Sequence, residues 1–223
     1  MKILKVFKMI FVLSLGLPVL AHAGWELYDN FDSQAIDQQK WWIGTGSAII
    51  SLENGRAKFV HQPNHPNQST YLSIRQDPEG VVGVRAKVSF QSCTGDVRAR
   101  ISGYPGKIGE NNVWSGLQLQ PSEERIYSNL GVESPPPTYT WLYDIWYGHF
   151  QKPIDIVGKT YDINMLFLND KILYEVVGLG KITYIYESQI SPPSNSFKGI
   201  GTRSTNGDGP CTVYFDDVYV YRK

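Results

Sequence analysis

CTVYFDDVYVYRK, residues 211–223, is the stretch that decides the fold of this chain. Its β-branched and aromatic residues are typical of a β-strand. We expect it to pair antiparallel with a second strand, Val81–Cys93, in a register that sets Cys93 opposite Cys211. The other pairs implied by this register are Lys87 with Asp217 and Val84 with Val220. One bond between the two cysteines would then tie the end of the chain to its middle.

Residues 1–23 have the pattern of a secretory signal peptide. Three early lysines precede an apolar run over 9–20 that is too short to span a membrane, and Ala21-His22-Ala23 fits an A-x-A cleavage site. An uncleaved N-terminal anchor is the alternative. We expect the mature chain to begin at Gly24 and to be secreted or periplasmic.

The mature chain, residues 24–223, has the length of one all-β domain. The sequence holds 21 basic and 21 acidic residues, so loss of the three signal-peptide lysines leaves a net charge of about −3. This balance indicates neither nucleic acid nor an anionic membrane as a partner. In an exported chain the two cysteines, Cys93 and Cys211, favour a disulfide, with two free buried thiols as the alternative.

Short alternating runs separated by turn residues predict antiparallel strands along the whole mature chain. Asn54-Gly55 is a strong hairpin signal between residues 47–53 and 56–62, and Thr94-Gly95-Asp96 is a second turn. The other expected strands are 97–103, 112–120, 125–133, 138–150, 160–168, 172–177, 181–187 and 197–204. About a dozen strands in one domain predict two stacked sheets, because a single open sheet would leave one face unburied.

Several stretches resemble the concanavalin A-like lectin/glucanase superfamily. They are the start WELYDNFDS (25–33) with Trp41-Trp42, the segment 158–177, and the closing runs 197–203 and 215–218. The resemblance implies an antiparallel two-sheet jelly-roll β-sandwich, with a concave sheet that holds a glycan in many members. Strands between residues 97 and 150 would form that concave sheet.

The catalytic motifs of that superfamily bear on whether this chain is an enzyme. Retaining glucanases of the fold carry Glu-x-Asp-x-Glu, since retention needs two carboxyl groups about 5–5.5 Å apart. No such motif occurs here, because Glu123 and Glu124 are adjacent and Glu133 precedes a proline loop. Polysaccharide lyases of the fold use Arg, Gln, His and Tyr. This chain has those residue types, outside the lyase pattern, at Arg98, Arg100, Gln118, Gln120, Tyr127, Tyr143 and His149.

Adjacent aspartates in the last strand suggest a structural calcium site. Several members of the superfamily bind calcium with an aspartate of the C-terminal strand and N-terminal groups. Here Asp216 with Asp29 or Asp32 and backbone oxygens could form such a shell. The alternative is an ordinary buried aspartate that accepts backbone hydrogen bonds.

The first functional hypothesis is a non-catalytic, lectin-like glycan-binding domain. Trp114 offers a flat apolar face for a sugar ring, and two arginines on one strand favour an acidic glycan. The predicted ligand residues are Arg98, Arg100, Trp114, Gln118, Gln120, Asn129 and Tyr143. The alternatives are a polysaccharide lyase or glycoside hydrolase of the same fold, or an envelope protein that binds another protein.

Overall fold

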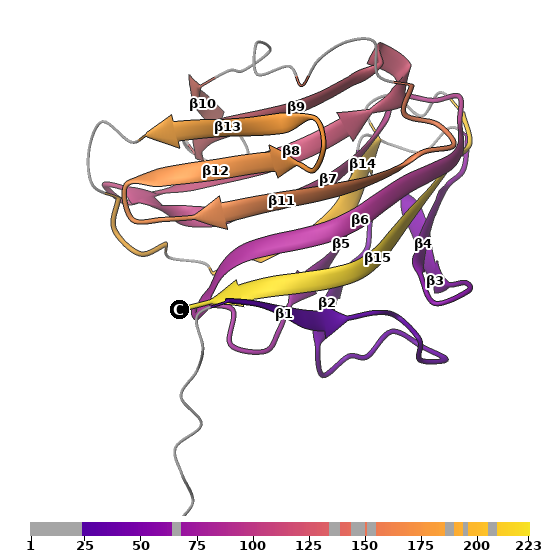
Figure 1. Cartoon of the computed structure of the whole chain (residues 1–223), viewed down its shortest axis with the longest axis horizontal. Helices are drawn as coiled ribbons and strands as arrows, with labels where there is room; N and C mark the ends of the chain where they lie inside the picture. The colour runs from indigo at the N-terminus through magenta and orange to yellow at the C-terminus, as the bar shows by residue number, and fades with distance from the viewer. Residues whose placement is uncertain are drawn as a thin grey trace, which may run out of the picture.

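A computed structural model of the chain describes residues 24–63, 68–133, 139–143, 150, 155–185, 190–193, 196–204 and 209–223, with only the backbone described at 133 and 139–143. These residues form two antiparallel sheets stacked as a sandwich (Figure 1). The all-β, two-sheet prediction is confirmed. None of the helices in the described part of the chain is long and apolar enough to cross a membrane.

Sheet A has eight strands and contains the pair predicted to decide the fold. In spatial order it holds β13 (Gly180–Ile185), β12 (Lys171–Val176), β11 (Thr160–Phe167), β6 (Val81–Cys93), β15 (Cys211–Arg222), β4 (Ala57–His61) and β3 (Ala48–Leu52). The eighth strand, β1 (Gly24–Asp29), also pairs with β15. It aligns with the second half of β15, while β4 aligns with the first half. Figure 1 shows β15, in yellow, lying between β6 and β1.

Sheet B has seven strands and contains the segment predicted to bind the ligand. Its order is β10 (Tyr139–Tyr143), β9 (Arg125–Glu133), β8 (Asn111–Gln120), β7 (Val97–Ile108), β14 (Lys198–Ser204), β5 (Ser69–Ile74) and β2 (Trp41–Gly44). A short 3₁₀ turn, η1 (Pro121–Glu123), joins β8 to β9. The strands between residues 97 and 143 therefore lie side by side in one sheet, as expected.

The pairing of β6 with β15 confirms the disulfide and most of the predicted register. Cys93 is bonded to Cys211, and Val84 lies opposite Val220. Lys87, however, lies opposite Asp216 and not Asp217, because irregularities shift the register near Val213 and again between Asp216 and Tyr219. Asp217 occupies the second irregularity with a φ of 44°. Its side chain still forms an ion pair with Lys87.

Two predicted turns have different outcomes. Asn54-Gly55 joins β3 to β4 as a hairpin, with positive φ at both residues, which is typical of a type I′ turn. Thr94-Gly95-Asp96 connects β6 of sheet A to β7 of sheet B, so it passes from one sheet to the other and forms no hairpin. Three strands were not predicted from the sequence: β1, β2 and β5.

One hydrophobic core fills the space between the sheets. On β8 the residues Val113, Leu117 and Leu119 are fully buried in it, at alternate positions as a half-buried strand requires. Trp41 of β2 is also buried there, in edge contact with Tyr28. The opposite face of sheet B is thereby left to carry polar side chains.

Candidate functional site

The outer face of sheet B is the face that points away from the core. On β8 it carries Trp114, Gly116, Gln118 and Gln120, which alternate with the core residues. Trp114 is 9% exposed but is not part of the core cluster. The predicted division of β8 into a core side and an outer side is therefore what the structure has.

Strand pairing aligns the outer residues in rows that cross sheet B. One row has small, buried residues at its centre and larger residues at its ends. It runs from Trp42 through Ser73, Gly199, Ser102 and Gly116 to Asn129. Small side chains keep the surface low along this row. Trp114 lies over one of them, since a Cβ on Gly116 would come within 2.8 Å of the Trp114 ring.

The next row places Arg100 near the middle of the sheet, between Gly201 and Gln118. Arg100 Nη2 donates a hydrogen bond of 2.8 Å to Ser69 Oγ, and its guanidinium lies 5.5 Å from the centre of the Trp114 ring. A planar cation therefore lies beside an aromatic face, at a distance that suits a cation–π contact.

Gln118 is nearly fully buried on this face, and its amide donates to Asn129 Oδ1 at 3.0 Å. Tyr127 is the cross-strand partner of Gln118. Burial raises the pKa of the Tyr127 hydroxyl, and the charges of Arg98 and Arg125 oppose the rise. Four of the predicted ligand residues, Arg100, Trp114, Gln118 and Asn129, thus form one connected group.

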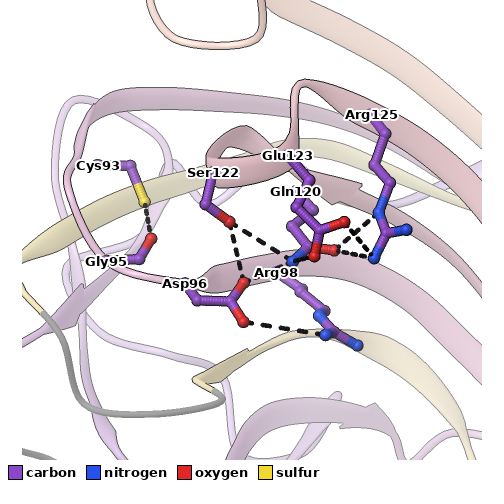
Figure 2. Close-up of polar contacts among 8 residues, drawn as sticks. All are labelled: Cys93, Gly95, Asp96, Arg98, Gln120, Ser122, Glu123 and Arg125. Carbon is purple, nitrogen blue, oxygen red and sulfur yellow. Dashed lines mark hydrogen bonds and ion pairs between the residues drawn. The ribbon is translucent and has the colours of Figure 1, made fainter.

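A third row is rich in arginine and ends in a polar network (Figure 2). Arg203 pairs with Arg98, and Gln120 pairs with Arg125. The Gln120 Nε2 group donates to Asp96 Oδ1 at 2.6 Å and to Glu123 Oε1 at 2.8 Å. Its Oε1 atom accepts from Arg125 Nε and Nη2 at 3.1 and 2.9 Å. Gln120, fully buried, thus links β8 to β9 and to the turn that precedes β7.

Arg98 is only partly engaged by this network. Its Nη2 atom lies 3.9 Å from Asp96 Oδ2. Its buried Nε atom has no hydrogen-bond partner in the part of the chain that the structure describes. An unsatisfied buried donor is costly, so this network leaves Arg98 incompletely satisfied.

The charge of the outer face is one-sided. It holds Arg98, Arg100, Arg125 and Arg203, and among the side chains described on the sheet B strands no outward one is acidic. The two nearby acids, Asp96 and Glu123, lie in the connecting turns and contact the network. The face is therefore suited to anionic groups.

Two alternate outward positions of β8, where a retaining pair of carboxyls could lie, carry amides. Gln118 and Gln120 occupy alternate outward positions of β8. A neutral amide offers donors and an acceptor but no proton to exchange near neutral pH. Of the two adjacent glutamates, Glu123 forms an ion pair with Arg125 at 2.9 Å and Glu124 adopts a left-handed conformation in the turn. The described outer face thus has no pair of carboxyls for glycoside hydrolysis.

Two predicted residues lie partly or wholly beyond this description. Tyr143 is in β10 opposite Leu130, but its side chain lies outside the described residues. His149, considered for lyase chemistry, also lies outside them. The outer-face positions of Arg125 and Arg203 were not predicted from the sequence. The available signal was that both are polar residues in strands of alternating pattern.

The three aspartates expected to bind calcium have different surroundings. Both Asp29 oxygens are engaged, by the Phe31 amide at 2.9 Å and by Trp41 Nε1 at 2.7 Å. Asp32 lies beside the β3–β4 turn. If Gly55 carried a side chain, its Cβ atom would lie 2.7 Å from Asp32 Oδ1. Burial, and next the charge of neighbouring Asp217, raise the pKa of Asp216.

A calcium shell at these residues would need oxygens other than carboxylates. The described residues contain no group of three or more His, Cys, Asp or Glu that could hold a metal. Calcium also takes backbone carbonyls. The expected carboxylate ligands remain Asp216 with Asp29 or Asp32, and calcium binding stays a prediction.

Comparison with solved structures identifies the fold. A laminarinase from Flavobacterium sp. UMI-01 superposes with a TM-score of 0.62 and 14% identity, covering 88% of this chain and 100% of that chain. The κ-carrageenase from Pseudoalteromonas carrageenovora, in complex with an oligotetrasaccharide of κ-carrageenan, gives 0.60 and 15%, covering 93% and 99%. A Bacillus licheniformis β-glucanase gives 0.55 and 11%, covering 90% and 97%.

No family model matches the sequence, and no curated protein matches it. At the identities above, the likeness shows the fold alone. The chain has the jelly-roll β-sandwich fold of these solved structures, as its sequence stretches predicted.

Proposed function

We propose that this protein is an exported, non-catalytic glycan-binding domain, whose ligand lies on the outer face of sheet B and carries anionic groups. The observation that carries the proposal is the centre of that face. There Arg100 lies 5.5 Å from the Trp114 ring, next to a row of small residues and among arginines without an outward acid on the described strands.

This combination suits an acidic sugar chain. The indole ring supplies apolar contact for a sugar ring, and guanidinium groups bind carboxylates or sulfates through charge-assisted hydrogen bonds. Solved proteins of similar fold act on polysaccharides by name, and one, a galactose-4-sulfate galactohydrolase, has a sulfated sugar in its name. The signal-peptide pattern and the Cys93–Cys211 disulfide support export.

Several structural neighbours are glycoside hydrolases, so hydrolysis is the second candidate. The amides at Gln118 and Gln120 weigh against a retaining carboxyl pair on β8. A hydrolase reading would therefore need catalytic groups from residues other than the described outward side chains of sheet B.

One experiment separates these functions. The mature chain would be tested by affinity electrophoresis against a sulfated galactan, a polyuronate and a neutral β-glucan, with parallel assays for new reducing ends and for unsaturated products. We expect retardation by an anionic glycan, weakened by added salt, and no product. Equal retardation by the neutral glucan, or no retardation at all, would overturn the proposal, and new reducing ends would establish the hydrolase instead.

A further inference from the structure

A pocket of about 460 Å³ lies at the end of the sandwich where β6 begins, opposite the disulfide end of that strand. This volume is within the range of about 300–1,000 Å³ that small-molecule sites occupy. Apolar side chains from three segments form much of the lining: Val81, Val82, Phe167, Leu168 and Ile190. The pocket is separate from the outer face of sheet B.

The pocket is walled by a segment that is fixed to β7. Ser191 exchanges two backbone hydrogen bonds with Lys107, at 2.9 and 3.1 Å. Next to it, a Cβ on Gly106 would lie 2.6 Å from Ile190 Cδ1, so Ile190 packs directly on the β7 backbone. Close packing of this kind gives the wall a fixed position.

Lys198 brings a buried amine to this lining. It is 4% exposed and extends from β14 on the side of the core residue Ile200. Its stem lies against β7, since a Cβ on Gly103 would be 2.9 Å from Lys198 Cγ and 3.1 Å from Phe167 Cζ. Its Nζ atom donates to the carbonyl of Pro78 at 2.9 Å.

That one hydrogen bond leaves the amine incompletely satisfied. A lysine ammonium has three donors, and within the described residues no second acceptor and no ion pair is found for Lys198. Burial lowers the pKa of Lys198 to about 8, with the charges of Glu79 and Asp77 acting against the shift. The charged form therefore lacks a close counter-ion.

We propose that this pocket binds a small amphiphile, in which an apolar body lies against Val82, Phe167 and Ile190 and a carboxylate accepts hydrogen bonds from Lys198. The carboxylate would supply both a counter-charge and the missing acceptors. Other charged groups of the lining are Glu79, Asp170 and Lys223, and Lys223 Nζ donates to Asn169 Oδ1 at 3.0 Å.

The test uses the mature chain with octanoate, and with octan-1-ol and octylamine as matched probes of the same length. Calorimetry should show octanoate binding most tightly, and methyl NMR should place the shifts at Val81, Val82 and Ile190. Lys198→Met should weaken octanoate at least tenfold and leave octan-1-ol unchanged, whereas Lys171→Met, outside the pocket, should change neither. Equal octanoate affinity in Lys198→Met and wild type would overturn the proposal, as would the absence of octanoate binding to wild type.

A second measurement needs no variant, in case Lys198→Met does not fold. The ¹³Cε resonance of Lys198 can be titrated with and without octanoate. Carboxylate binding beside the amine should raise the pKa of Lys198, because an opposite charge favours the ammonium form. An unchanged titration curve at saturating octanoate would show that the carboxylate does not contact Lys198.

Discussion

The outer faces of the two sheets carry charge in different ways. On sheet A the outward basic residues lie next to acids on the same sheet. The ion pairs there are Arg85–Asp162, Lys87–Asp217 and Lys181–Glu175. On sheet B the outward positions hold arginine beside Trp114 and small residues, and the acids nearby lie in turns at one end.

This difference in charge indicates which outer face can bind a ligand. Exposed ion pairs contribute little to stability, about 0–1 kcal/mol each, but they neutralise the surface of sheet A. On sheet B the described strands place arginines beside an aromatic ring, and the acids that pair with Arg98 and Arg125 come from turns. The two outer faces thus differ in how their charges are arranged, and this difference makes the face of sheet B the candidate ligand face.

Breaking the disulfide should have the largest effect, and it tests whether sheet B depends on sheet A. The bond closes a loop with a sequence separation of 118 residues, for which the chain-entropy model gives on the order of 4–5 kcal/mol. The double variant Cys93→Ser with Cys211→Ser should lose stability of this order in urea unfolding. Below its melting temperature it should still bind the glycan, because the bond lies in sheet A. Loss of glycan binding in a folded double variant would show that the two faces are coupled.

Lys198 extends from sheet B toward the interior, so it lies between the two outer faces. Its removal should give the next largest change in the free energy of unfolding. Burial lowers its pKa from 10.5 to about 8. Between these values the unfolded chain binds more protons, so the stability of wild type rises with pH and the burial penalty is complete below pH 8. Relative to Lys198→Met, wild type should gain on the order of 3 kcal/mol between pH 7 and pH 10.5. Urea unfolding of both proteins across this range measures the gain, and parallel curves would refute it.

Arg100→Ala and Trp114→Ala test the sheet B face directly. Each removes a charge-assisted or stacking contact, so each should weaken glycan binding by about 1–3 kcal/mol. The matched control is Arg85→Ala on sheet A, which should leave binding unchanged. Thermal unfolding should show both sheet B variants folded, since neither residue is in the core cluster. Collapse of Trp114→Ala, or equal weakening by Arg85→Ala, would contradict the assignment of the face.

Sequence patterns predicted the fold well because each of the patterns used depends on neighbouring residues or on one covalent bond. The cysteines, Asn54-Gly55 and the alternation of β8 each report on one pair of strands or one turn. The Lys87 pairing was wrong by one residue, because irregularities in β15 depend on packing that alternation does not record. Likewise, a three-residue turn at 94–96 gives no sign that its strands join different sheets.

The strand faces of the candidate-site residues could be predicted from the sequence, but their hydrogen-bond partners could not, for the same reason. Alternation identified which side of β8 faces outward, but it could not distinguish the roles of Gln118 and Gln120. Gln118 donates a hydrogen bond to Asn129, whereas the hydrogen-bond partners of Gln120 lie in two turns and at Arg125. The partners of Gln120 come from residues 96 and 123–125, which meet only when β7, β8 and β9 pair. Such a network is set by tertiary structure.

Calcium should give the smallest effect, at the adjacent acids Asp216 and Asp217 of sheet A. Asp216 forms none of the ion pairs found among the described residues, and burial with the Asp217 charge raises its pKa, so a cation near it would stabilise its charged form. For dissociation constants of about 10⁻⁴–10⁻³ M, 1 mM calcium would add about 0.4–1.4 kcal/mol of stability. Chelator should therefore lower the melting temperature of wild type slightly, and calcium but not magnesium should restore it.

Asp216→Asn should abolish this response to chelator and calcium. Asp29→Asn should instead destabilise the chain with or without calcium, because Asp29 accepts hydrogen bonds from Trp41 and Phe31. A melting temperature of wild type that ignores chelator would leave Asp216 as an ordinary half-buried aspartate.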